Sequence, residues 1–87
     1  MYNPQSYAIQ IESLLKLPSH TADKIAKNPF EFLKGFLDKA YEKSEDKARL
    51  IDAFDEKYAN YKNTHLINWT EADAKQLVED LREIFHN

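Results

Sequence analysis

The sequence predicts an all-α protein: one compact single-domain bundle of four main helices and a short fifth one. The chain has 87 residues, which is enough for one domain but too few for two. One Gly and three Pro are far fewer turn residues than an all-β fold of this length needs. Apolar residues make up 43% of the chain, which is enough for a core, and they recur largely at helical spacing.

The first main helix is expected at residues 4–17. Asn3 can cap its first turn, and Pro4 occupies the first helical position, where a missing N–H costs nothing. Pro18 disfavours helical backbone in the residue before it and so ends the helix at residue 17 or earlier. Ile9 is an apolar residue on the polar side of this helix, and the apolar face consists of Tyr7, Ala8, Ile11, Leu14 and Leu15.

A short helix is expected at residues 19–27. Ser19 is a candidate cap, and Pro29 stops the helix. Its apolar face is small and consists of Ala22, Ile25 and Ala26.

The second main helix, residues 29–43, is predicted to be the central element. Its apolar residues fill about half of the helical circumference, which is wider than the stripe of a surface helix. Asn28, Pro29 and Glu31 form a start signal of cap, first-turn proline and capping-box acid. Gly35, the only glycine of the chain, falls on the polar side, where a bend or the close approach of another backbone would explain it.

The third main helix is expected at residues 45–62, with Ser44 as its cap. Residues 63–68 then form a loop in which Leu66 and Ile67 are apolar, so part of the loop should turn inward. The apolar face of the helix consists of Leu50, Ile51, Phe54, Tyr58 and Tyr61.

The fourth main helix, residues 71–85, has the clearest start signal. Thr70 and Asp73 resemble a capping box, and Trp69 can pack as a hydrophobic staple onto Ala74. If Trp69 is such a buried staple, its truncation to alanine should cost about 2–4 kcal/mol. The apolar arc that follows has the width typical of an amphipathic helix.

No constellation of catalytic or metal-binding residues is evident, and the protein is predicted to be non-enzymatic, with no cofactor. The three histidines, His20, His65 and His86, lie in separate segments without the three- or four-residue spacing of helical metal sites. The chain has no cysteine, no G-x-S-x-G motif and, with one Gly, no phosphate-binding loop.

The charge distribution favours a partner with a basic surface. The net charge is −3, and residues 63–87 alone contain five acids and two bases. The start of the sequence lacks the basic and apolar regions of a signal peptide, and no apolar run reaches bilayer length. Together with the absence of cysteine, this predicts a cytoplasmic protein that does not associate with membranes.

The eleven aromatic residues are many for so small a core. We therefore predict a function in protein–protein binding, as an inhibitor, an antitoxin- or immunity-type protein, an adaptor or an assembly subunit. The alternative for the aromatic residues is that all of them are core. The candidate partner-binding residues are Phe32, Gly35, Tyr58, Tyr61, Trp69, Glu79, Asp80 and Glu83.

Two other functional hypotheses remain open. Residues 19–43 have the outline of a helix-turn-helix, which suggests a nucleic-acid-associated regulator. The acidic net charge, and an expected recognition helix that opens with Pro29, Phe30 and Glu31, speak against nucleic acid. The third hypothesis is a homo-oligomer formed through the broad central helix and Ile9.

Overall fold

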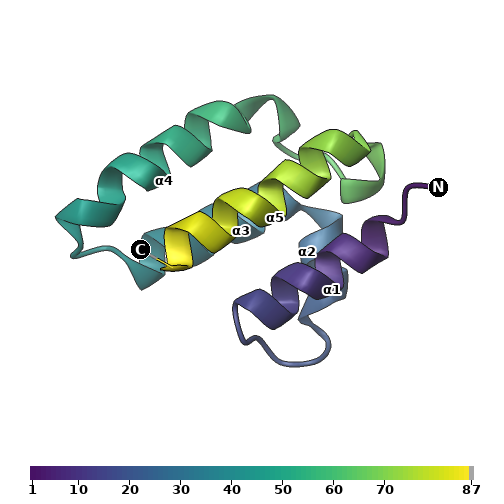
Figure 1. Cartoon of the computed structure of the whole chain (residues 1–87), viewed down its shortest axis with the longest axis horizontal. Helices are drawn as coiled ribbons and strands as arrows, with labels where there is room; N and C mark the ends of the chain where they lie inside the picture. Colours follow the sequence, from purple (N-terminus) through teal and green to yellow (C-terminus); the bar gives the residue numbers. More distant parts are fainter. Residues whose placement is uncertain (87) are drawn as a thin grey trace.

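Five α-helices and two 3₁₀ helices make up most of the part of the chain that the structure describes, residues 1–86 (Figure 1). This computed structural model contains no strand within those residues, and the predicted all-α fold is confirmed. The elements are α1 (Pro4–Leu14), α2 (Thr21–Lys27), α3 (Pro29–Ala40), α4 (Glu45–Lys57), η1 (Ala59–Tyr61), η2 (Leu66–Asn68) and α5 (Glu71–His86).

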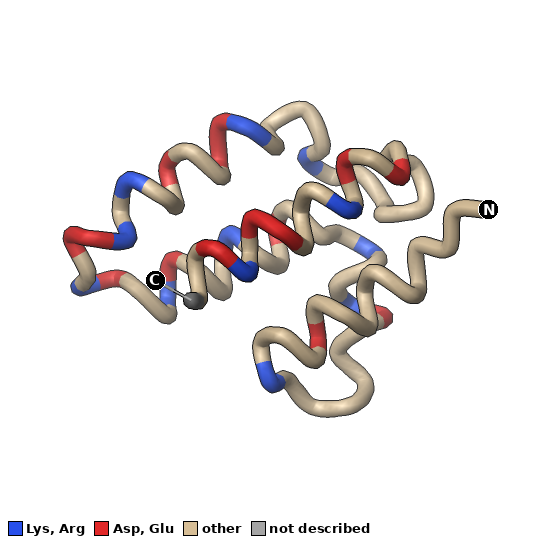
Figure 2. The backbone as a smooth tube through the Cα atoms, viewed as in Figure 1, with Lys and Arg blue, Asp and Glu red and all other residues tan. Residues whose placement is uncertain are grey.

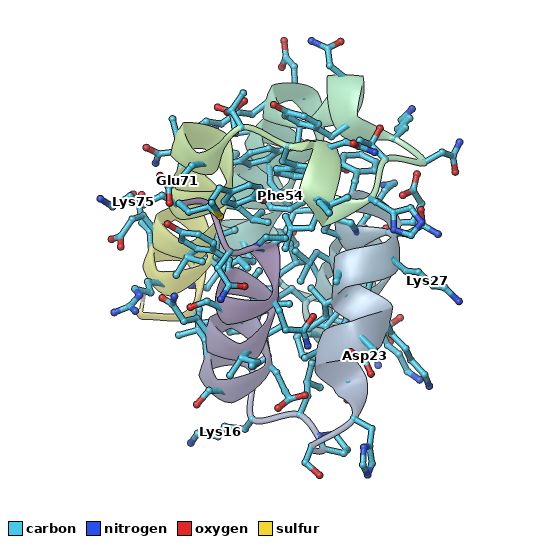
Figure 3. The ribbon with its side chains drawn as sticks, turned by 90° about the vertical axis from the view of Figure 1, so that its right-hand side faces the viewer. Lys16, Asp23, Lys27, Phe54, Glu71 and Lys75 are labelled. Carbon is cyan, nitrogen blue, oxygen red and sulfur yellow. The ribbon has the colours of Figure 1, made fainter. Side chains whose placement is uncertain are left out.

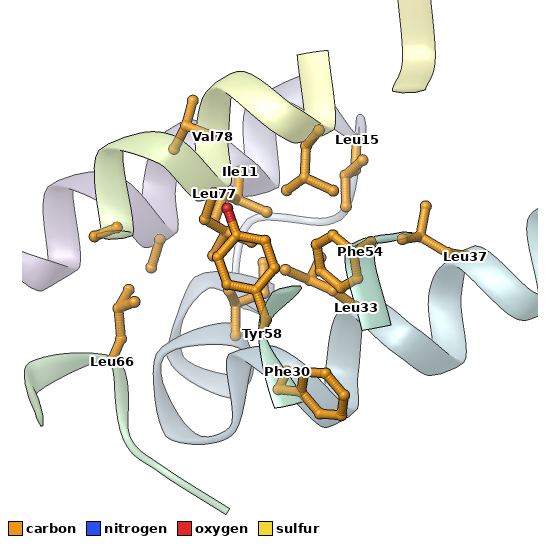
Figure 4. Packing of buried hydrophobic residues seen from close by; sticks show 14 of the residues in the cluster. Ile11, Leu15, Phe30, Leu33, Leu37, Phe54, Tyr58, Leu66, Leu77 and Val78 are labelled. Atoms are coloured by element: carbon orange, nitrogen blue, oxygen red, sulfur yellow. The ribbon is translucent and has the colours of Figure 1, made fainter. Parts of the chain in front are cut away.

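The helices form a closed ring around one core. Each helix packs against the next one in the chain, and α5 returns to pack against α1. Figure 3 shows α1 and α2 side by side, and Figure 4 shows Phe54 of α4 and the following Tyr58 pointing into the space between α3 and α5. The largest buried side chains come from α1, α2, α3, α5 and η2 and from Tyr58, which follows α4; they include Ile11, Ile25, Leu33, Tyr58, Leu66 and Leu77.

Helix α1 ends at Leu14, three residues before the predicted limit at residue 17. Lys16 takes a left-handed conformation with φ 55°, and its N–H donates to the Ser13 carbonyl. The N–H of Leu17 donates to the carbonyl of Glu12. These two bonds form a Schellman motif, which ends the helix before Pro18 can do so.

The short helix begins at Thr21, two residues later than predicted, and Ser19 does not cap it. Instead, the Glu12 carboxylate of α1 accepts the N–H of Ala22 at 2.7 Å. A side chain from a neighbouring helix thus supplies the cap, which local sequence cannot reveal.

Two further helix ends differ from the prediction. α3 ends at Ala40 rather than at residue 43, and residues 41–43 form a turn. α4 ends at Lys57 rather than at residue 62, because the chain tightens into η1, where the N–H of Tyr61 donates to the carbonyl of Tyr58.

Three of the predicted helix caps are confirmed. The side chains of Asn3, Ser44 and Thr70 accept backbone N–H groups at the starts of α1, α4 and α5, at 3.3, 3.3 and 3.1 Å. The predicted capping box of α3 is wrong. Asn28 makes no side-chain cap bond, and Glu31 instead accepts the N–H of Asn63 at 2.8 Å.

Within residues 1–86, no helix combines the length and the apolar composition needed to cross a bilayer.

Candidate functional site: the groove between α4 and α5

Three of the predicted aromatic candidates, Tyr58, Tyr61 and Trp69, form a stacked cluster. Trp69 is 3% exposed, and its ring stacks on Tyr61 with centroids 4.0 Å apart and on Tyr58 at 5.5 Å. The Trp69 indole N–H also donates to the carbonyl of Thr64 at 3.4 Å. Tyr58 is 2% exposed, so these two side chains hold the fold and offer almost no surface to a partner.

Tyrosine hydroxyls connect this cluster to the acids of α5. Tyr58 donates to Asp80 Oδ2 at 2.6 Å, and Tyr61 donates to Asp73. Burial and the adjacent Asp80 carboxylate raise the pKa of Tyr58 well above its ordinary value. Burial tends to raise the pKa of Asp80, but hydrogen bonds from Tyr58, Lys57 and Gln76 outweigh it, and the pKa is lowered. Asp80 is therefore a charged structural acceptor as well as a surface residue.

The two candidates on α3 lie apart from this cluster. Phe32 is half-buried and packs against the core. Gly35 is exposed, and a Cβ built on it would meet nothing within 4 Å. The close backbone approach considered for Gly35 is thereby ruled out.

Polar contacts hold α4 to α5 at two places. Near the start of α4, the buried Lys47 donates through Nζ to the carbonyl of Ile84 at 2.5 Å. Near its end, Lys57 Nζ lies 2.9 Å from Asp80 Oδ2, the same atom that accepts the Tyr58 hydroxyl. Figure 1 shows the two helices running alongside each other between these points.

Between the two sets of contacts lies an open hollow of about 130 Å³. Its floor is apolar, and Asp80 and Glu83, two of the predicted candidates, border it on the α5 side. Leu50 is half-buried there and Ala53 is exposed. We call this feature the α4–α5 groove; it is lined by Leu50, Ala53, Phe54, Lys57, Asp80, Glu83 and Ile84.

The α5 side of the groove is bordered by acidic residues, Asp80 and Glu83, and Figure 2 shows acidic residues along α5. Glu79 and Glu83 are both exposed, and neither forms an ion pair with a basic side chain of the described residues. Both lie in the C-terminal half of α5, and Glu83 lies in its last turn, where the helix dipole adds negative potential. Asp80, by contrast, is neutralised by Lys57. The three acidic candidates of α5 thus divide into one structural residue and two free ones.

Sequence reasoning missed the α4 side of the groove. Ala53 was not singled out, and Leu50 was assigned simply to the apolar face of its helix. A signal was present, because Leu50, Ala53 and Lys57 follow one another at spacings of three and four and so lie along one side of α4. Which neighbour covers that side depends on the tertiary fold.

The predicted helix-turn-helix outline corresponds to α2 and α3. A single residue, Asn28, separates α2 from α3, and Phe30 at the start of α3 is buried. That end of α3 has no basic side chain exposed for contact with base edges. The nucleic-acid hypothesis stays a prediction without a structural feature that favours it.

Within the described residues, no group of three or more His, Asp or Glu side chains is arranged to hold a metal ion. Comparison of the chain with protein-family models, with curated proteins and with solved structures finds no match.

Proposed function

We propose that this protein acts by binding another protein and that the α4–α5 groove is the binding surface. One observation carries the proposal: an apolar hollow lies open between two helices that polar contacts hold together on either side of it. A buried apolar side chain contributes about 1.5–3 kcal/mol to association when it leaves water. The hollow can thus take one anchor residue of a partner.

The interface must extend beyond the hollow. A specific interface covers about 800 Å² on each partner, which is roughly a seventh of the 5771 Å² surface of this chain. Around the hollow, such an area includes the exposed residues Arg49 on α4 and Gln76 and Glu79 on α5. Of the residues predicted from sequence, Glu79, Asp80 and Glu83 belong to this surface, and Tyr58 and Trp69 support it from inside.

A pair of matched substitutions tests the proposal. Ala53 and Ala48 are both exposed alanines of α4, but only Ala53 lines the groove, and Ala48 faces a hollow on the α3 side of the helix. Ala53→Arg fills the groove with a long side chain, and Ala48→Arg makes the same chemical change elsewhere. Because both positions are exposed, both variants should keep the fold, which circular dichroism checks.

The measurement is co-purification from the cells that make the protein, with the partner quantified by mass spectrometry. The wild type and Ala48→Arg should recover a common protein. The amount of it recovered with Ala53→Arg should be at least about tenfold lower. Equal recovery by all three would place binding elsewhere. Recovery of nothing by the wild type would remove the proposal.

A further inference from the structure

The α4–α5 groove also carries information about the chemistry of its partner, and the inference drawn from it rests on the function proposed above. The hollow measures about 130 Å³, well below the ~300–1,000 Å³ of sites that enclose a small-molecule ligand. It is open to solvent and bordered by helices on both sides. A space of this size and shape accepts one large side chain that belongs to a longer molecule.

The shape of the groove favours a helix as that molecule. Leu50, Ala53 and Lys57 form a row along α4, and Asp80, Glu83 and Ile84 form the opposing row on α5. Two neighbouring helices leave a furrow into which the side-chain ridge of a third can fit. Another common mode of peptide binding adds a strand to a sheet edge, and residues 1–86 contain no sheet.

The charge of the α5 side selects a basic partner. Helix α5 contains five acids and two bases, and Glu79 and Glu83 are exposed beside the groove without a basic partner among the described residues. The same charge repels nucleic acid and anionic lipid surfaces. On the α4 side, Arg49 and Lys57 are basic, so the border of the groove as a whole carries both charges. The basic side chains of a bound helix therefore belong on its α5-facing side.

We propose that the α4–α5 groove binds a basic amphipathic helix of a partner protein. One Leu, Met or Phe side chain of that helix enters the hollow. Lys or Arg residues three or four positions away pair with Glu79 and Glu83.

A displayed library of helical peptides, with one face randomised, tests this inference on the full-length protein. Selection uses the immobilised wild type, with removal of peptides that still bind Ala53→Arg. The enriched sequences should share one large apolar residue with Lys or Arg at a spacing of three or four. Because exposed ion pairs are screened, binding of a synthesised peptide should weaken as salt rises.

Charge reversal gives the sharper test. Glu83→Lys should weaken binding of the selected peptide by up to about fivefold, since an exposed ion pair contributes up to about 1 kcal/mol. A peptide whose basic residue is changed to Glu should regain binding to Glu83→Lys. Glu42→Lys changes the net charge equally at an exposed position just beyond α3 and should leave the affinity unchanged.

Each of the other possible outcomes would overturn one part of the proposal. Selected peptides without basic residues, or indifferent to Glu83→Lys, overturn the basic partner but leave groove binding intact. If no peptide is enriched, the helical partner is overturned, and the co-purification of Ala53→Arg decides the proposed function independently. A dimer in light scattering that Ala53→Arg abolishes makes a second copy of this chain the occupant instead.

Discussion

Truncation of Trp69 is the strongest single test of how the end of α4 is built. Trp69→Ala removes a ring that is 3% exposed and stacks on Tyr61 at 4.0 Å and on Tyr58 at 5.5 Å. Truncation of a buried aromatic residue costs about 3–5 kcal/mol, and each lost aromatic pair accounts for about 0.5–1.5 kcal/mol beyond buried area. We expect a loss of about 3–4 kcal/mol, the upper part of the range that the sequence predicts.

Urea unfolding followed by far-UV circular dichroism measures this loss, because the substitution removes the only tryptophan fluorophore. The midpoint should fall with little change in slope, as expected when stability changes but the exposed surface does not. A domain of this size has a total stability toward the lower end of about 5–15 kcal/mol. Trp69→Ala therefore comes close to unfolding, and Trp69→Phe, which keeps a ring but loses the indole N–H bond, provides a milder variant at about 1 kcal/mol.

Ile67→Ala is the matched control, because Ile67 lies two residues before Trp69 and is 65% exposed. Its effect should stay within about 0.5 kcal/mol. A loss for Trp69→Ala no larger than that of Ile67→Ala would show that the aromatic cluster does not support the fold, and the reasoning about Tyr58 and Tyr61 would be wrong with it.

Four further predictions concern stability. Gly35→Ala should stabilise the protein by about 0.5–1 kcal/mol in urea unfolding, since an added Cβ meets nothing within 4 Å. If the variant binds the selected peptide with unchanged affinity, Gly35 is not part of the binding site. The same change to glycine should have opposite signs at two neighbouring positions: Lys16→Gly should stabilise by about 1 kcal/mol because φ is 55°, and Ser13→Gly, inside α1, should destabilise by a similar amount. Because the pKa of Asp80 is lowered, its contribution is present above the ordinary pKa of 3.8 and is lost as the pH falls below it, so Asp80→Asn should flatten the acid side of a stability–pH curve. The raised pKa of Tyr58 gives the opposite dependence, with stability lost as the pH rises above 10, and Tyr58→Phe should flatten that side.

The sequence predicted those features that depend on neighbours in the chain. Asn3, Ser44 and Thr70 cap their helices because each side chain reaches an N–H three residues later, which is a local arrangement. The same reasoning failed for Asn28 and Glu31. Glu31 bonds to Asn63, 32 residues away, and no pattern in the first turn of α3 encodes that contact.

The candidate site was predictable on one side only. The acids of α5 stood out as a charged strip, and Asp80 and Glu83 do border the groove. Their different roles were not visible, because Tyr58 and Lys57 reach Asp80 from another helix. For Trp69, the sequence allowed both a buried staple and a partner-binding residue, and its 3% exposure confirms burial.

The sequence of α4 explains why a groove lies between α4 and α5. Eight of its thirteen residues are charged, and its buried apolar residues are only Ile51 and Phe54, followed by Tyr58 at its end. So narrow an apolar stripe cannot cover both α3 and the C-terminal half of α5. The polar contacts of α4 with α5 are made by Lys47 and Lys57, whose long side chains reach the Ile84 carbonyl and Asp80. The apolar floor is left open to solvent by the residues that the structure describes, and a partner helix that supplies the missing side chain would complete the packing that α4 leaves unfinished.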